Sequence, residues 1–241
     1  MAWASGIEVA LRAISLLLVR DMLGTRLSPE THRLIGQILQ ASLHWLERFP
    51  SRFSSANNHL IAELAGEYLI GLALGQSVDK PRAALIRECA LQILPDGMPA
   101  EQSPSYGAFS AEMLLLCALA GQEAGTPFPD SYLHRLGAFA EWTRWIIPDL
   151  ARFGDDDEGR AMTLGEEPDY LCSVSAAISA FTGRAGLPTP EGDLRALLFG
   201  QSTTAADPVE GLRSFPDGGL SLWHGQMGGR TIAFSLDHGP L

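Results

Sequence analysis

Residues 54–63 have the sequence SSANNHLIAE, and they mark the start of the helix around which the chain is organised. Serine and asparagine side chains accept hydrogen bonds from the free N–H groups of a first helical turn. Apolar residues then recur with helical spacing as far as Leu72, and Gly75 can end the helix. The stretch therefore predicts a helix that begins near Asn58 and ends near Gly75.

His59 and Glu63 stand four residues apart, so a helix places them on one face, within reach of each other. Asn58 and His59 would lie at the helix N-terminus, where donors converge and an anionic group is favoured. This pattern has two interpretations. Either the asparagines cap the helix and Glu63 holds His59, or these side chains form part of a binding site.

Helical periodicity covers most of the chain, and it gives way to alternation after residue 207. Helices of about 15–20 residues joined by short links predict antiparallel helical hairpins. Two strands are predicted where apolar residues alternate. The helices are expected at residues 7–23, 29–49, 58–75, 80–94, 107–124, 131–147, 169–182 and 193–199, and the strands at 220–224 and 231–236.

The composition is that of a folded, acidic protein of 241 residues, 46% hydrophobic, with a net charge of −11. Residues 1–100 carry 9 basic and 9 acidic side chains, whereas residues 101–241 carry 8 basic and 19 acidic ones. Nucleic-acid binding requires a basic surface and is not expected. No apolar run is long enough to span a membrane, and no signal peptide is visible. Cys89, Cys117 and Cys172 are expected to be buried thiols without disulfides.

A second polar stretch, DGMPAEQSPSY at residues 96–106, is rich in turn formers and precedes another apolar helix. Together, NNH with a following glutamate, then DG, EQS and PSY, resemble the heparinase II/III-like polysaccharide lyases. The resemblance extends to WASGIEVALR at 3–12, GDDDEGR at 154–160, FPDGG at 215–219 and DHGPL at 237–241. These segments occur in the family's order.

The resemblance implies a mainly α fold: an incomplete (α/α) toroid of antiparallel helical hairpins at residues 1–206, followed by the first strands of a β-sandwich at residues 207–241. It also implies that the toroid is truncated at its N-terminus and the sandwich at its C-terminus. The chain is then expected to be a catalytically incomplete fragment of a periplasmic or extracellular protein.

By the same resemblance, the reaction is β-elimination on an anionic, uronic-acid-containing polysaccharide or oligosaccharide, without a cofactor. Removing the weakly acidic proton next to a carboxylate requires neutralisation of that carboxylate. Asn58 and His59 match the family positions that perform this task, and Tyr106 matches the general acid or base near the leaving oxygen. Gly107 replaces the histidine that usually follows this tyrosine. Residues expected to contact substrate or to support the site are Glu63, Glu101, Gln102 and Arg160.

The acidic run Asp155, Asp156 and Asp157 invites a calcium interpretation. Its distance from Gly159 is too short for an EF-hand loop, so a solvated loop without a metal is expected, with Arg160 reaching the substrate. Of the histidines near the strands, His224 and His238, neither matches the family's sandwich histidine, and His238 is expected to be structural.

Two other classes of function remain open. Inverting glycoside hydrolases also use (α/α) toroids, with two carboxylates that Glu63, Asp96 and Glu101 could supply. A non-catalytic carbohydrate-binding toroid is the other class. The lyase interpretation predicts that Asn58, His59 and Tyr106 converge on one concave face.

Overall fold

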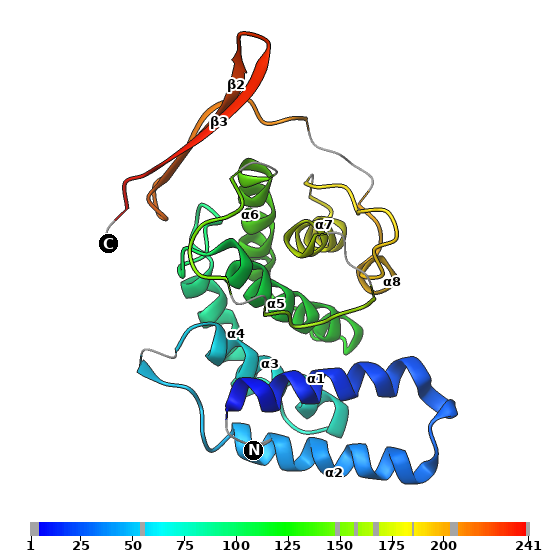
Figure 1. Ribbon diagram of the computed structural model, residues 1–241. Helices are drawn as coiled ribbons and strands as arrows, with labels where there is room; N and C mark the ends of the chain where they lie inside the picture. Colours follow the sequence, from blue (N-terminus) through cyan, green and yellow to red (C-terminus); the bar gives the residue numbers. More distant parts are fainter. Residues whose placement is uncertain are drawn as a thin grey trace. The chain divides into compact units, whose positions relative to one another are not determined.

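The computed structural model describes residues 5–53, 56–147, 150–156, 159–165, 169–184, 186–202 and 207–239. Within these ranges the chain is mainly α, as expected, with a small antiparallel sheet near the C-terminus (Figure 1). It divides into two compact units: Met1–Cys89 with Leu116–Phe128, and Ala90–Leu115 with Pro129–Leu241. Motif residues that lie outside the described ranges are Trp3, Ala4, Ser54, Ser55, Asp157, Glu158, Pro240 and Leu241.

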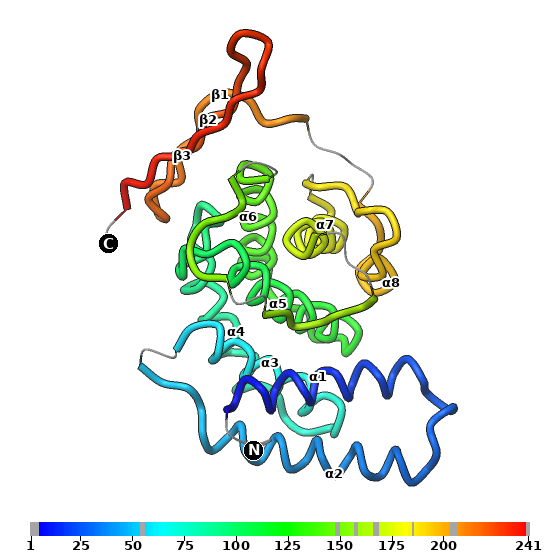
Figure 2. Tube along the Cα trace, viewed as in Figure 1, coloured from blue at the N-terminus to red at the C-terminus, as the bar shows by residue number. Residues whose placement is uncertain are grey.

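The first unit is built on three long helices, α1 (Gly6–Leu23), α2 (Pro29–Leu46) and α3 (Asn58–Leu74). Helices α1 and α2 form a hairpin through the short 3-10 helix η1 (Gly24–Arg26), and both pack against α3 (Figures 1 and 2). The Ser28 side chain caps α2 by accepting the Thr31 N–H at 3.1 Å. This start of α2 is the one that the sequence predicts.

The part of helix α4 (Asp79–Gln92) that ends at Cys89, together with residues 126–128, completes the core of the first unit. The guanidinium of Arg82 lies 5.1 Å from the Phe128 ring centroid and donates to the Pro127 carbonyl at 2.5 Å. The rings of Tyr68, on α3, and Phe128 meet edge to face at 5.4 Å. Residues 126–128 are therefore part of this core, although they lie far along the chain.

Glu67, half-buried on α3, has a pKa raised from 4.5 to about 7, mainly by burial, with the Glu47 carboxylate adding to it and Lys80 opposing it. The folded state thus holds a proton that the unfolded state releases. The resulting stability is full below pH 4.5 and is lost as the pH rises through about 7.

We therefore expect Glu67→Gln to stabilise the protein at about pH 8, by on the order of 1 kcal/mol once solvent screening is allowed for, and to change little at about pH 4. Urea unfolding of both proteins at the two pH values measures this. An equal effect of the substitution at both pH values would contradict the prediction.

The second unit contains α6 (Asp130–Ile146), α7 (Tyr170–Thr182) and α8 (Ala196–Phe199), while α5 (Pro104–Glu123) contributes residues to both units. Helices α6 and α7 pack together. No helix in the described ranges combines the length and the apolar character needed to cross a bilayer.

Strands β1 (Gly211–Phe215), β2 (Leu220–Met227) and β3 (Arg230–Asp237) form an antiparallel sheet in the order β1-β2-β3. One face of β2 is buried, and there the ring nitrogen Nε2 of His224 donates to the Trp145 carbonyl of α6 at 2.6 Å. On the other face Trp223 pairs with Leu212 and stacks on Phe234 at 5.5 Å. His224 therefore holds the sheet against a helix of its own unit.

Several elements differ from the sequence-based expectation. Helix α5 begins at Pro104 rather than after Tyr106, since proline suits the first helical position. Helix α8 is a single turn, Ala196–Phe199, because Asp193 and Arg195 enter a buried polar network instead. Strand β1 was not predicted. It is short, and its outward positions are exposed.

Candidate functional site

Glu63 is the point where three segments of the first unit meet. Its carboxylate is 1% exposed and accepts from the Ser51 N–H at 2.6 Å and from the Ser51 hydroxyl at 2.7 Å. Helix α1 begins at Gly6 so close to Glu63 that a Cβ at this position would overlap the carboxylate. These contacts fix the segment before α3 and the start of α1 to one buried acid. The expected role of Glu63 toward His59 stays a prediction.

The N-terminus of α3 is capped by Asn57, whose side-chain oxygen accepts the His59 N–H at 3.3 Å. Asn58 follows in the first turn and is only 5% exposed. His59 is half-buried. The capping interpretation is therefore confirmed for Asn57, while Asn58 and His59 lie where the free N–H groups of a helix favour an anionic group.

His59 and Glu63 line one open cavity of about 410 Å³ in the first unit. Its size falls within the range of about 300–1,000 Å³ that is common for small-molecule sites. The shared cavity agrees with the four-residue spacing of the two side chains on α3. The other lining residues are Ser5, Gly6, Trp45, Phe49, Pro50, Ser51 and Arg52.

In the second unit, the segment that leads into Tyr106 is packed against the acidic loop. Ser103 caps α5 by accepting the Tyr106 N–H at 3.3 Å, and its hydroxyl donates to the Asp155 carbonyl at 2.5 Å. Gln102 has a φ of 52°, a left-handed conformation that is uncommon outside glycine. A Cβ on Gly154 would overlap the Gln102 carbonyl, so a glycine is needed in the acidic loop here.

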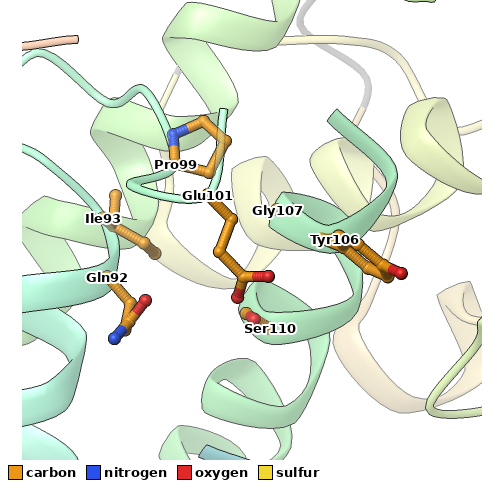
Figure 3. A pocket seen from close by; sticks show the side chains of 7 residues that line it. All are labelled: Gln92, Ile93, Pro99, Glu101, Tyr106, Gly107 and Ser110. Carbon is orange, nitrogen blue, oxygen red and sulfur yellow. The ribbon is translucent and has the colours of Figure 1, made fainter. Parts of the chain in front are cut away.

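Glu101 and Tyr106 line a narrow depression that also includes Gln92, Ile93, Pro99, Gly107 and Ser110. The Glu101 carboxylate points toward Ser110, whereas the Tyr106 hydroxyl points away from the other labelled side chains (Figure 3). The depression has no room for a group the size of a water molecule. A sugar ring therefore does not fit inside it, and the phenol is presented outside it.

Asp96 joins the start of this segment to the turn between β1 and β2. One of its oxygens accepts the Met98 N–H at 3.2 Å, and the other accepts the N–H groups of Asp217 and Gly218 at 2.8 and 3.0 Å. A Cβ on Gly218 would overlap the Met98 side chain, so the two segments are in close contact. Three motif segments, at 96–106, 154–160 and 215–219, thus come together within the second unit.

We expect Asp96→Ala to destabilise the protein by about 1–3 kcal/mol, because it leaves backbone donors without their acceptor. Hydrogen exchange should accelerate at Met98, Asp217 and Gly218. Asp156→Asn, in the exposed part of the acidic loop, is the control and should change neither quantity. Unchanged exchange at Gly218 in the Asp96→Ala protein would contradict the proposed link.

A buried polar network, absent from the sequence-based expectation, holds the segment that carries Arg160. Glu112, on α5, accepts from Arg195 Nε at 2.5 Å, from the Tyr170 hydroxyl at 2.7 Å and from the Met162 N–H at 3.1 Å. Burial raises the pKa of Glu112, and the Arg195 guanidinium opposes this. Burial, together with the neighbouring Glu112 carboxylate, raises the pKa of Tyr170 well above its ordinary value.

Arg195 also donates to the Met162 carbonyl at 2.9 Å, and the exposed Arg160 guanidinium lies 5.5 Å from the Tyr170 ring centroid. The backbone next to Arg160 is therefore fixed by the network, while its charge faces solvent. One feature of the sequence could have indicated this buried polar network. Glu112 interrupts an apolar helical run, and a carboxylate in such a place needs a partner.

The candidate residues are thus divided between the two units. The first holds Asn58, His59 and Glu63, and the second holds Glu101, Gln102, Tyr106 and Arg160. The expected convergence of Asn58, His59 and Tyr106 stays a prediction.

Among the described residues, no three His, Cys, Asp or Glu side chains are grouped closely enough to hold a metal ion. Comparisons with protein-family models, with curated proteins and with solved structures each found no match for this chain.

Proposed function

We propose that the protein is a polysaccharide lyase that cleaves a uronic-acid-containing polysaccharide by β-elimination, and that its helices belong to an (α/α) toroid. The observation that carries the proposal is the cavity of the first unit, which is lined by His59, Glu63 and Arg52 among others. An imidazole, a guanidinium and a helix N-terminus offer the donors that a uronate carboxylate requires.

In this reaction, the proton on the carbon next to the carboxylate is removed, and the glycosidic oxygen on the following carbon leaves with a proton. Asn58 and His59 would stabilise the negative charge that grows on the carboxylate as the C–H bond breaks. Tyr106 would transfer a proton to or from the sugar. A free phenol has a pKa of roughly 10, so a role as base requires a neighbour that lowers this pKa.

Hydrolysis by a pair of carboxylates is less well supported. Asp96 already accepts hydrogen bonds from three backbone N–H groups, and Glu63 is buried with both oxygens bound to Ser51. Neither carboxylate is placed to transfer a proton to a glycosidic oxygen without losing these contacts. The cavity alone would also suit a protein that binds sugars without cleaving them.

The test is turnover by the protein as the organism makes it, on alginate, heparosan and polygalacturonate. Elimination creates a conjugated C=C bond, so ultraviolet absorbance should rise together with the reducing ends. A rise in reducing ends without absorbance would show hydrolysis instead. Binding of a uronate polymer with neither change would show a non-catalytic protein, and it would overturn the lyase proposal.

A further inference from the structure

We propose that Trp45, Phe49 and Arg52 form a subsite for a uronate ring that binds the substrate but takes no part in bond cleavage. We refer to Trp45 and Phe49 together as the aromatic wall, and Arg52 lines the same cavity. The inference deepens the proposed lyase function and rests on it for the nature of the sugar. None of the three residues was singled out in the sequence.

The aromatic wall consists of two rings that contact each other in the lining of the cavity. Trp45 lies on the last turn of α2, and Phe49 follows it by four residues. Their ring centroids are 4.5 Å apart, with the planes tilted by 44°. Trp45 is half-buried, which fixes its ring, and Phe49 is 56% exposed, which leaves its ring open to a ligand.

Aromatic faces carry negative charge, and the C–H groups on one face of a pyranose ring carry positive charge. A sugar laid on such a face therefore gains an electrostatic contact in addition to the burial of its apolar side. Aromatic side chains also have few rotatable bonds, so ordering them on binding costs little conformational entropy. The cavity of about 410 Å³ beside the wall provides room for a sugar ring.

Arg52 makes an acidic sugar the best match for this surface. It is exposed at the cavity, and the adjacent Ser51 is anchored to Glu63 by two hydrogen bonds. The backbone at Arg52 is thus fixed next to the wall, and its guanidinium can hold a carboxylate through two parallel hydrogen bonds. The Glu63 carboxylate lines the same cavity and is bound to Ser51, so the Arg52 guanidinium must outweigh its negative charge when a uronate binds.

The charge of the first unit does not oppose an anionic ligand. The chain as a whole has a net charge of −11, but the residues of the first unit, 1–89 and 116–128, carry 9 basic and 9 acidic side chains. Exposed charges farther away than about 8–10 Å are largely screened at physiological ionic strength. Local donors at the cavity therefore determine the sign of the interaction.

The experiment compares the affinity of the intact protein for alginate and galacturonan tetrasaccharides with its affinity for neutral cellotetraose, by calorimetry. Phe49→Ala and Arg52→Gln, both at exposed positions, should each weaken uronate binding by about tenfold, equivalent to about 1.4 kcal/mol. Trp45→Phe should keep most of the affinity. Arg48→Gln is the matched control, because Arg48 contacts His44 and does not line the cavity.

Wild-type protein that binds cellotetraose as tightly as the uronates, or binds none of them, would overturn the subsite. So would equal losses in Arg52→Gln and Arg48→Gln. Turnover by the same variants separates the subsite from the lyase proposal, since substitutions at Phe49 and Arg52 should raise KM with little change in kcat. Cleavage with an unaltered KM in Phe49→Ala refutes the subsite alone. Uronate binding through the wall without any cleavage refutes the lyase alone.

Discussion

Arg195→Met is expected to lower the free energy of unfolding by about 3–5 kcal/mol, because it leaves Glu112 as an uncompensated buried charge. The side chains of Arg195 and Glu112 are 1% and 0% exposed, so water cannot replace the lost partner. Urea unfolding measures the change. Arg20→Met is the control, since Arg20 pairs with Asp21 at 3.4 Å and the Asp21 side chain is 73% exposed. Loss of this pair should cost only about 0–1 kcal/mol.

The cost of Arg195→Met should also depend on pH. Burial raises the pKa of Glu112. The substitution removes the Arg195 guanidinium, which is the group that most strongly lowers this pKa. The folded variant then retains a proton that the unfolded chain releases above its ordinary pKa of about 4.3, so the stability of the variant falls as the pH rises from there. Destabilisation should be smaller at about pH 5 than at about pH 8.

The double variant with Arg195→Met and Glu112→Gln checks the cause of this effect. It removes the stranded charge, so it should be more stable than Arg195→Met alone at about pH 8 and less dependent on pH. A double variant that is no more stable than the single one would show that lost packing, rather than the buried charge, causes the destabilisation.

Tyr106→Phe is expected to lower kcat by about 10²–10⁴-fold, the contribution typical of a general acid or base. The substitution keeps the ring and removes only the hydroxyl to which we assign proton transfer, so the unfolding free energy should change little. The absorbance of the unsaturated product gives kcat and KM on the substrate that the native protein cleaves. His59→Ala should also lower kcat, because its donor acts most strongly on the charge of the transition state.

Asp156→Asn, in the acidic loop, is the control for both the Tyr106 and the His59 variants. Asp156 is exposed, and its substitution should alter KM slightly or not at all. Loss of turnover in Asp156→Asn, with near-normal turnover in Tyr106→Phe, would place the chemistry elsewhere and refute the role proposed for Tyr106.

The helices could be predicted because burial of one face imposes a periodicity that is visible in a single segment. The shared cavity of His59 and Glu63 follows from the same local rule. Contacts between distant segments have no such signature. The partners Glu112 and Arg195 lie 83 residues apart, and Asp96 reaches Asp217 across 121 residues. Sequence spacing carries no information about these distances.

Backbone contacts were equally hidden from the sequence. Gly6 and Gly154 were recognisable as motif residues, but their role is to let a neighbouring segment approach, which becomes visible only when Glu63 and Gln102 are in place. The aromatic wall escaped notice for a related reason. Trp45 resembles any apolar residue of an amphipathic helix until the cavity beside it is known.

The first unit is not a continuous stretch of chain, and this affects how it can form during synthesis. Residues 1–89 leave the ribosome early, but Leu116–Phe128, which supply the contacts of Phe128 with Tyr68 and Arg82, leave later. At about 5–20 residues per second, the roughly 40 residues from 90 to 128 take roughly 2–8 s to translate. During that interval the nascent protein exposes an unfinished apolar surface, which is the kind of surface that molecular chaperones bind.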